Sequence, residues 1–188
     1  MFQGGEYHTW TDEEIAQFES RWRPDTRERT AFALLLFTGQ RGSDVRRMGW
    51  QDVKENLIYV VQQKTGEKLW IPLHADLAAV LEGRRRDVGT ILLTAHGKGF
   101  SVKGFGNFMS DRIAMAGLPA RCVTHGLRKA AARRLAEAGC SSKEIGAITG
   151  HRTLQEIERY TKAAEQKRLA VAAMSRLEAQ RPNRNSQT

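Results

Sequence analysis

Hydrophobic positions along the chain follow two periods, and the helical period covers most of the length. The longest apolar run, Ala31–Phe37, predicts a buried helix, and residues 165–178 form an Ala- and Leu-rich amphipathic pattern. Residues 57–62 and 69–73 are instead β-branched and aromatic, and a glycine-containing turn separates them. They predict a β-hairpin, to which Ile91–Leu93 adds a third short strand. The pattern therefore predicts an α+β fold, mostly α-helical with a small antiparallel β-sheet.

Several polar residues mark where helices should begin. Thr11 and Ser141 are each followed three positions later by glutamate, which is the capping-box pattern, and Thr153 repeats it. We expect Ser101 to open a further helix and Thr124 to cap the next one, because both residue types are good N-caps.

The length of 188 residues fits one domain with a substantial core. We expect this domain to span residues 1–178, with residues 179–188 as a flexible C-terminal tail. No apolar stretch approaches the ~20 residues that a membrane span requires, and the start of the chain lacks the pattern of a secretory leader. Two cysteines, Cys122 and Cys140, give no disulfide framework and favour a reducing cytoplasm.

Positive charge is concentrated in the last third of the chain. The formal net charge is +9. Residues 1–120 hold 16 Lys and Arg against 15 Asp and Glu, whereas residues 121–188 hold 14 against 6. Such a segment favours a polyanion such as nucleic acid, although a ribosomal protein or a protein that binds anionic membranes would carry similar charge.

The stretch from His125 to Tyr160 contains the groups needed for phosphodiester chemistry. His125 and Arg128 share one face of a helix's first turn, where backbone N–H groups and the helix dipole already favour an anion. An arginine can clamp two phosphoryl oxygens, and a histidine can exchange a proton near neutral pH. His151 follows a glycine and precedes a short helix that carries Tyr160, so the spacing brings a phenol beside an imidazole.

Two further cations lie upstream in suitable settings. Arg41 follows the apolar helix and a glycine, and Asp44 is near enough to orient it. Lys64 lies at the predicted hairpin turn, from which a flexible side chain can reach a phosphate. Taken singly, each of these residues also fits an ordinary structural role, such as a surface arginine, a loop lysine or a core tyrosine.

A zinc site is an alternative use of some of the same residues, which are Cys122, His125, Cys140 and His151. A stable zinc site normally pairs closely spaced ligands, and Cys140 has no such neighbour in the sequence. The chain also lacks H-E-x-x-H and the glycine-rich loop that binds nucleotide phosphates. We therefore expect neither a metal nor a cofactor.

Five short motifs together resemble the catalytic domain of tyrosine recombinases of the phage-integrase type. They are Thr38-Gly-Gln-Arg41, Gln63-Lys64-Thr-Gly66 followed by Ile71-Pro-Leu73, His125-Gly-Leu-Arg128, Thr149-Gly-His151, and Arg159-Tyr160. Each is weak alone, but all five occur in the order and spacing of the family, from about Trp10 to Leu177. The resemblance implies the tyrosine recombinase catalytic-domain fold and site-specific DNA recombination, as in integration or excision of a phage or another mobile element.

The resemblance also implies how protons move in the reaction. Tyr160 would attack the DNA and form a 3′-phosphotyrosine, releasing a 5′-hydroxyl. His125 would act as general base toward Tyr160, and Lys64 would protonate the leaving 5′ oxygen. The covalent bond conserves the energy of the phosphodiester, so rejoining to another strand needs no nucleotide cofactor.

The remaining implied roles concern the phosphate and the DNA backbone. Arg41 and Arg128 would hold the non-bridging oxygens and stabilise the pentacovalent phosphorane, and His151 would hydrogen-bond the phosphate. Further backbone contacts are expected from four basic side chains, which are Lys103, Arg112, Arg133 and Arg134.

The resemblance implies double-stranded DNA as the partner, a homotetramer on DNA and a monomer in isolation, with accessory DNA-bending or directionality proteins and a cytoplasmic, nucleoid-associated location. The chain departs from the family pattern at Gly126, where an acidic residue is frequent, and at Asp44, where glutamate is common. Family members usually carry an N-terminal core-binding domain, which we expect to be absent from this chain because the catalytic domain begins near Trp10.

Two other functions remain open from the sequence. A type IB topoisomerase uses the same chemistry but reseals the same strand. A non-catalytic DNA-binding regulator on the same scaffold is the third reading, although a binder has no use for Tyr160.

Overall fold

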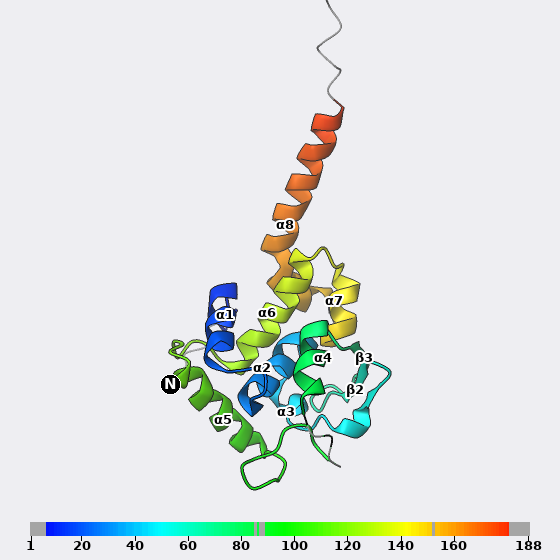
Figure 1. Ribbon diagram of the computed structural model, residues 1–188. Coiled ribbons are helices and arrows are strands. Elements are labelled where there is room, and N and C mark those ends of the chain that lie inside the picture. Colours follow the sequence, from blue (N-terminus) through cyan, green and yellow to red (C-terminus); the bar gives the residue numbers. More distant parts are fainter. Residues whose placement is uncertain (1–6, 85, 87–88, 152, 181–188) are drawn as a thin grey trace, which may run out of the picture.

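The computed structural model describes residues 7–84, 86, 89–151 and 153–180, apart from some side chains in the first half of the last helix. Helices make up most of this part of the chain, with a small sheet at one side (Figure 1). The helical elements are α1 (Asp12–Arg21), α2 (Arg27–Thr38), α3 (Gly42–Val45), η1 (Trp50–Asp52), α4 (Ala75–Glu82), α5 (Val102–Met115), α6 (Thr124–Glu137), α7 (Ser142–Thr149) and α8 (Leu154–Ala179). The strands are β1 (Val53–Lys54), β2 (Leu57–Val61) and β3 (Lys68–Pro72). The predicted α+β class is confirmed.

Helix α2 forms the centre of the core. Its residues 30–36 are all buried, which confirms the buried helix predicted from the apolar run. Phe32 stacks on Phe18 of α1 with 4.4 Å between ring centroids, and Trp10 contacts both rings. Since burial of one large apolar side chain stabilises a fold by about 1.5–3 kcal/mol, this cluster holds α1 and the segment before it on α2.

The start of α1 is fastened to the loop ahead of α6. Thr11 and Glu14 form the predicted capping box. Glu14 also accepts hydrogen bonds from His8 (2.7 Å) and Arg121 (2.9 Å). Burial acts to raise the pKa of Glu14, but the Thr11 backbone N–H and these two side chains hold that pKa at about 2. Glu14 is therefore ionised at neutral pH and links two segments that are distant in the sequence.

The predicted hairpin is confirmed as β2 and β3, which pair antiparallel. Ile58 lies opposite Ile71 on the buried face of the sheet, whereas Tyr59 lies opposite Trp70 on the outer face, with 4.6 Å between their rings. This alternation of buried and outer positions is the period-two pattern of a sheet that covers the core on one side only.

The third strand was predicted in the wrong place. Within the described residues, Ile91–Leu93 contributes only isolated bridges at its margins, and the strand that joins the sheet is β1. A tight turn connects β1 to β2, with positive φ angles at Glu55 (48°) and Asn56 (62°). Asparagine tolerates this conformation better than most residues, so Asn56 was the residue in the sequence that could have indicated this turn. A strand of two residues is too short to show a period.

Most predicted helix starts are confirmed, and one is wrong. Ser101 caps α5, and Ser141 forms a capping box at α7. Thr124, however, is the first residue of α6 rather than its cap. Val123 takes the extended cap conformation, and its carbonyl accepts hydrogen bonds from the Trp10 indole and the Gly126 N–H. Tertiary packing therefore sets this boundary instead of a side-chain cap.

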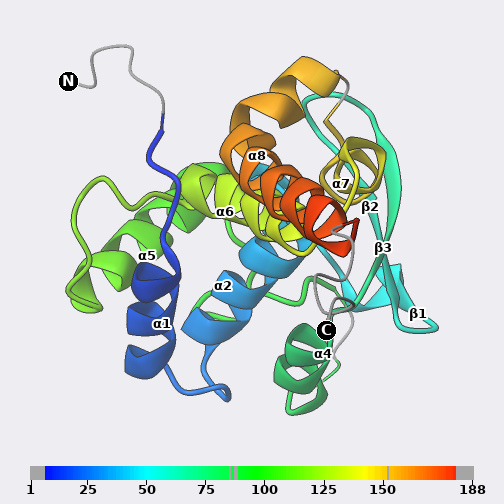
Figure 2. The same ribbon diagram turned by 90° about the horizontal axis from the view of Figure 1, so that it is seen from above.

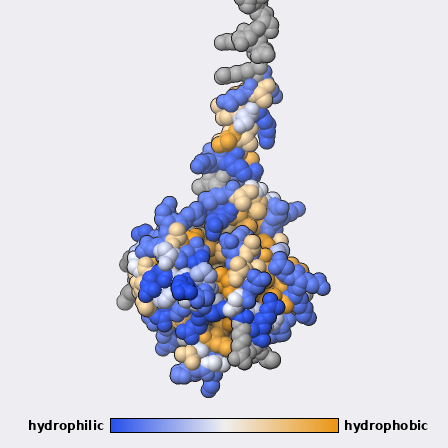
Figure 3. All heavy atoms as spheres, viewed as in Figure 1, coloured by the Kyte–Doolittle hydropathy of each residue, from blue (hydrophilic) through white to orange (hydrophobic). Residues whose placement is uncertain are grey.

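Helix α8 is continuous and joins two segments that the sequence suggested separately, the short helix with Tyr160 and the amphipathic stretch 165–178. Its first turns contact α6 and α7, where Ile157 is buried, and its second half projects from the body of the molecule (Figure 1). Exposed apolar side chains lie among polar ones on the projecting half (Figure 3), namely Leu169, Val171, Met174 and Leu177. No helix in the described part of the chain has the length and apolarity needed to cross a membrane.

Candidate active site

Arg128 lies at the point where two other helices end. Its side chain is almost fully buried, with 2% of the residue exposed. The Nη1 atom donates to the carbonyls of Gly39, at the end of α2, and of Thr149, the last residue of α7, each at 2.7 Å. Carbonyls at helix C-termini lack partners within their own helix and carry partial negative charge. They therefore stabilise the buried guanidinium and fix its plane.

A buried glutamine, Gln62, connects this arginine site to the hairpin. Its Nε2 donates to Gln40 Oε1 (2.7 Å) and to the Thr149 carbonyl (2.8 Å). Its Oε1 accepts from Arg41 Nη1 (3.3 Å) and from Thr65 Oγ1 (2.6 Å). One side chain thus joins the end of α2, the start of α3, the hairpin turn and the end of α7. Neither Gln62 nor Gln40 was singled out from the sequence.

Two glycines in the motifs allow these helix ends to come so close. Gly39 and Gly150 end α2 and α7 with positive φ angles of 62° and 70°. A Cβ atom on Gly150 would lie 2.4 Å from Gln62 Nε2, and one on Gly39 would lie 3.1 Å from the Thr149 side chain. Glycine is required at both positions by conformation and, at Gly150, by space as well.

His125 lies in the first turn of α6, where the charges of four cations act on it. The ring is half-buried, and burial is the largest cause that lowers its pKa. The charges of Arg128, Arg41, Lys129 and Lys64 lower the pKa of His125 further. These groups come from α6, the start of α3 and the hairpin turn, which are far apart in the sequence. His125 is therefore neutral at pH 7 and able to accept a proton.

His151 is held by the residue two positions before it. Its Nδ1 lies 2.7 Å from Thr149 Oγ1, and that hydroxyl already donates its single proton to the Ile145 carbonyl. The hydroxyl can therefore only accept from the ring, which assigns the proton of His151 to Nδ1. A neutral ring in this tautomer has an acceptor at Nε2, so donation from Nε2 to a phosphate oxygen requires the protonated imidazolium.

The last two predicted catalytic residues are described to different extents. Lys64 is exposed at the turn between β2 and β3, and the Thr65 hydroxyl fastens this turn to Gln62. Tyr160 lies within α8, but its side chain, like that of Arg159, is outside the described part of the structure.

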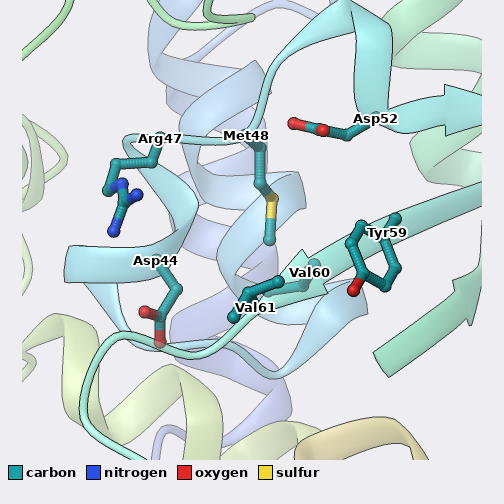
Figure 4. Close-up of a pocket in the computed structure, with 7 residues that line it drawn as sticks. All are labelled: Asp44, Arg47, Met48, Asp52, Tyr59, Val60 and Val61. Atoms are coloured by element: carbon teal, nitrogen blue, oxygen red, sulfur yellow. The ribbon is translucent and has the colours of Figure 1, made fainter. Parts of the chain in front are cut away.

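Asp44 has a different role from the one expected. Its carboxylate points toward the chain that leaves β2 (Figure 4), where Oδ1 accepts from the backbone N–H of Gln63 at 2.8 Å. Arg41 is oriented by Gln62 instead. A small pocket lies beside Asp44 and contains none of the predicted catalytic residues. It is lined by Asp44, Arg47, Met48, Asp52, Tyr59, Val60 and Val61.

The four expected DNA-backbone contacts lie outside this site and differ in their surroundings. Arg133 pairs with Asp12 (2.8 Å) and Glu137 (2.7 Å), and Arg112 pairs with Glu28 (3.2 Å). The other two, Lys103 on α5 and Arg134 on α6, are exposed to a greater degree. Contact with DNA from these four residues stays a prediction.

The residues of the zinc alternative are separated in the described structure. The three donor groups that do lie within 4.8 Å of one another there are His8, Glu14 and Cys122. Burial and the neighbouring Glu14 carboxylate raise the pKa of Cys122 to about 12, so its sulfur is a thiol at neutral pH. Cys140 instead packs beside the second apolar cluster, which contains Ile145 and Ile157.

Comparison with known proteins gives the family of this chain. A family model described as the phage integrase family matches residues 11–167. The chain belongs to the phage integrase family. Prophage integrase IntE of Escherichia coli (strain K12) is 29% identical over an alignment of 154 positions that covers 69% of this chain and 39% of IntE. The chain spans 15% to 39% of the length of the curated integrases that it matches.

Solved structures of integrases and related recombinases share the fold. XerA recombinase aligns with a TM-score of 0.75 and 17% identity, over 92% of this chain and 66% of XerA. A lambda integrase tetramer bound to a Holliday junction aligns with a TM-score of 0.66 and 25% identity, over 80% of this chain and 49% of that one. The tyrosine recombinase catalytic-domain fold predicted from the motifs is thus confirmed.

Proposed function

We propose that this integrase domain cleaves and rejoins DNA strands through a covalent 3′-phosphotyrosine, as part of site-specific recombination for a phage or another mobile element. The observation that carries the proposal is that Gln62 and the Thr149 carbonyl join Arg41 and Arg128 in one network, with the half-buried His125 in the first turn of the helix that carries Arg128. The charges of these two arginines, Lys129 and Lys64 all lower the pKa of His125, so the site repels a further positive charge. It suits a group that brings negative charge with it, such as a phosphodiester.

In the proposed reaction, the Tyr160 oxygen forms a bond to the scissile phosphorus while the bond to the 5′ oxygen breaks. The phenolic proton passes to the neutral imidazole of His125, and the Lys64 ammonium gives a proton to the leaving 5′ oxygen. Religation is the reverse, with a 5′-hydroxyl as the attacking group. The phosphotyrosine conserves the energy of the phosphodiester, so rejoining requires no nucleotide cofactor.

Arg41 and Arg128 supply the electrostatic stabilisation in this scheme. Both guanidinium groups are held by Gln62 or by helix-end carbonyls, so they need little reorganisation when charge develops on the phosphorane. His151, as an imidazolium with its Nδ1 proton on Thr149, would donate its second proton to a phosphate oxygen.

Recombination further requires DNA and several protomers. A homologue of known structure, lambda integrase, has been seen as a tetramer on a Holliday junction, and the same assembly is our proposal for this chain. The exposed apolar side chains of α8 support a protein contact in that assembly, and the domain would be a monomer without DNA. The proposed boundaries are a catalytic domain at 1–178 with a tail at 179–188, and the proposed location is the cytoplasm, on the nucleoid.

Covalent capture tests the proposal without knowledge of the DNA site. The chain is incubated at low salt with a pool of nicked suicide duplexes of randomised sequence, and protein–DNA adducts that survive detergent are isolated and sequenced. We expect adducts with the wild-type chain, enrichment of one sequence, and complete loss of adduct in Tyr160→Phe.

Tyr7→Phe and the double variant are the matched controls, because Tyr7 is a second phenol close to His125. If the adduct persisted in Tyr160→Phe and disappeared in Tyr7→Phe, the nucleophile would be Tyr7 and not Tyr160. Absence of any adduct would favour a DNA-binding regulator. Relaxation of supercoiled plasmid carrying the enriched site, with no recombinant product, would instead favour topoisomerase activity.

A further inference from the structure

The chain ahead of α1 forms a strap, residues Tyr7–Trp10, that passes over the start of α6 (Figure 2). The indole N–H of Trp10, which is fully buried, donates to the carbonyl of Val123 just before α6. The Lys129 ammonium donates to the carbonyl of Tyr7, and Arg133 Nη2 donates to the carbonyl of Trp10 at 3.4 Å. Three hydrogen bonds therefore fix the course of the strap along the helix.

The strap packs closely against α6 at Gly126. A Cβ atom at this position would lie 2.3 Å from the His8 carbonyl and 2.7 Å from the Trp10 ring, so no larger residue fits while the strap is in place.

The strap brings an aromatic ring onto His125. The centroid of the Tyr7 ring lies 4.6 Å from that of the imidazole, with 45° between the two planes. Tyr7 is itself 53% exposed, so its ring lies between the imidazole and solvent rather than in the core. We propose that the strap is a positioning element for His125, in which the Tyr7 ring fixes the orientation of the imidazole and shields one of its faces from water.

The charges around His125 determine what loss of the ring should do. The Tyr7 ring of the strap contacts the imidazole, and four described cations act on it through their charge, namely Arg41 from the start of α3, Lys64 from the hairpin turn, and Arg128 and Lys129 from α6. Burial and the four cations all lower the pKa of His125. Removal of Tyr7 reduces burial and leaves the cations, so the pKa should rise toward its ordinary value.

Histidine NMR tests the contact without DNA and therefore without reliance on the proposed function. In the 188-residue chain, with His125 assigned through His125→Asn, we expect Tyr7→Ala to change the ring-current shift of His125 and to raise its titration midpoint. Tyr7→Phe should restore both values. Tyr59→Ala removes a ring from a pair of the same 4.6 Å spacing on the outer sheet and should change neither. Unchanged His125 resonances and midpoint in Tyr7→Ala would overturn the inference.

The consequence for catalysis rests on the proposed role of His125 as general base. Because the base must be neutral, cleavage by Tyr7→Ala should fail at a higher pH than wild-type cleavage as the solution is acidified. Looser orientation should lower the rate by about tenfold even at the optimum. Gly126→Ala, which displaces the strap but keeps Tyr7, should reproduce both effects, with circular dichroism to confirm folding.

The two experiments separate the two ideas. A shifted NMR midpoint with no wild-type cleavage supports the strap contact and contradicts the proposed function. A shifted midpoint with a wild-type pH–rate profile contradicts the positioning role alone.

Discussion

Helices α6 and α8 lie against each other, yet each departs from the usual relation between polarity and burial in its own direction. Helix α6 buries charged residues, since Arg128 and Lys129 are only 2% and 4% exposed. Helix α8 exposes apolar residues, since Leu169 and Leu177 are 56% and 60% exposed. Charged side chains are rarely buried without partners, and a row of large apolar side chains is rarely left in water.

The two departures differ in how the fold compensates them. The charges of α6 are met from within the chain, by the carbonyls of Gly39 and Thr149 and by the strap. The apolar side chains on the projecting half of α8 belong to a segment that extends beyond the body (Figure 1). The difference indicates that the proposed phosphate-binding half of the site is preorganised, whereas the exposed half of α8 supports the proposed contact with another protomer.

The largest loss of covalent capture is expected from substitution of Arg128, which would disrupt the preorganised half of the site. Arg128→Lys keeps the charge but cannot hold two carbonyls and clamp a phosphate with one planar group. We expect covalent capture to fall by about 10²–10³-fold. Arg128→Ala should in addition lower the free energy of unfolding by roughly 2–4 kcal/mol, because buried carbonyls lose a charged donor.

Urea denaturation and single-turnover capture measure these two effects. Arg134→Ala, on the same helix but with an exposed side chain, is the stability control and should remain within ~0.5 kcal/mol of wild type. If Arg128→Lys captured DNA at the wild-type rate, the proposal that this guanidinium stabilises the phosphorane would be wrong.

The next effect in size is at Gln62, which tests whether the buried network positions Arg41. Gln62→Ala removes contacts to Gln40, Arg41, Thr65 and Thr149 together. We expect about a tenfold to hundredfold loss of capture and a loss of about 2 kcal/mol in stability. Gln63→Ala is the matched control, because its side chain is exposed on the same turn and only its backbone binds Asp44. Equal effects from the two variants would mean that the turn, and not the network, is what matters.

The sequence predicted the residues with distinctive chemistry and missed those that only support them. Arg41, His125 and His151 were recognisable because basic side chains beside glycines at helix ends are unusual and follow a known order. Gln62 was not, because a glutamine at the end of a strand ordinarily lies at the surface. Gln62 contacts the α2–α3 connection, the hairpin turn and the end of α7 because it is buried among them. Burial of a single polar residue leaves no periodic signal in the sequence.

Local boundaries were predictable where the signal was also local. The capping boxes at Thr11 and Ser141 contain both of their partners within four residues, and both are confirmed. The start of α6 depends on Trp10, which is 113 residues from the carbonyl it binds, so Thr124 was wrongly expected to be the cap. The strap was missed for the same reason, although Gly126 was visible as a departure from the family pattern.

The smallest change in stability is expected on α8, and it gives the sharpest test of the comparison. Leu169→Gln with Leu177→Gln alters one stripe of the helix while keeping residues of high helix propensity. If this stripe serves a second protomer, the free energy of unfolding should stay within ~0.5 kcal/mol of wild type. Covalent capture on a single half-site should be unchanged. Assembly of several protomers on a complete site, measured by sedimentation, should be lost, while Ser175→Ala, at an exposed position on the opposite face of the same helix, should assemble normally. A double variant that unfolds more easily would show that α8 packs on its own domain, in which case exposed apolar residues on this helix carry no information about a partner.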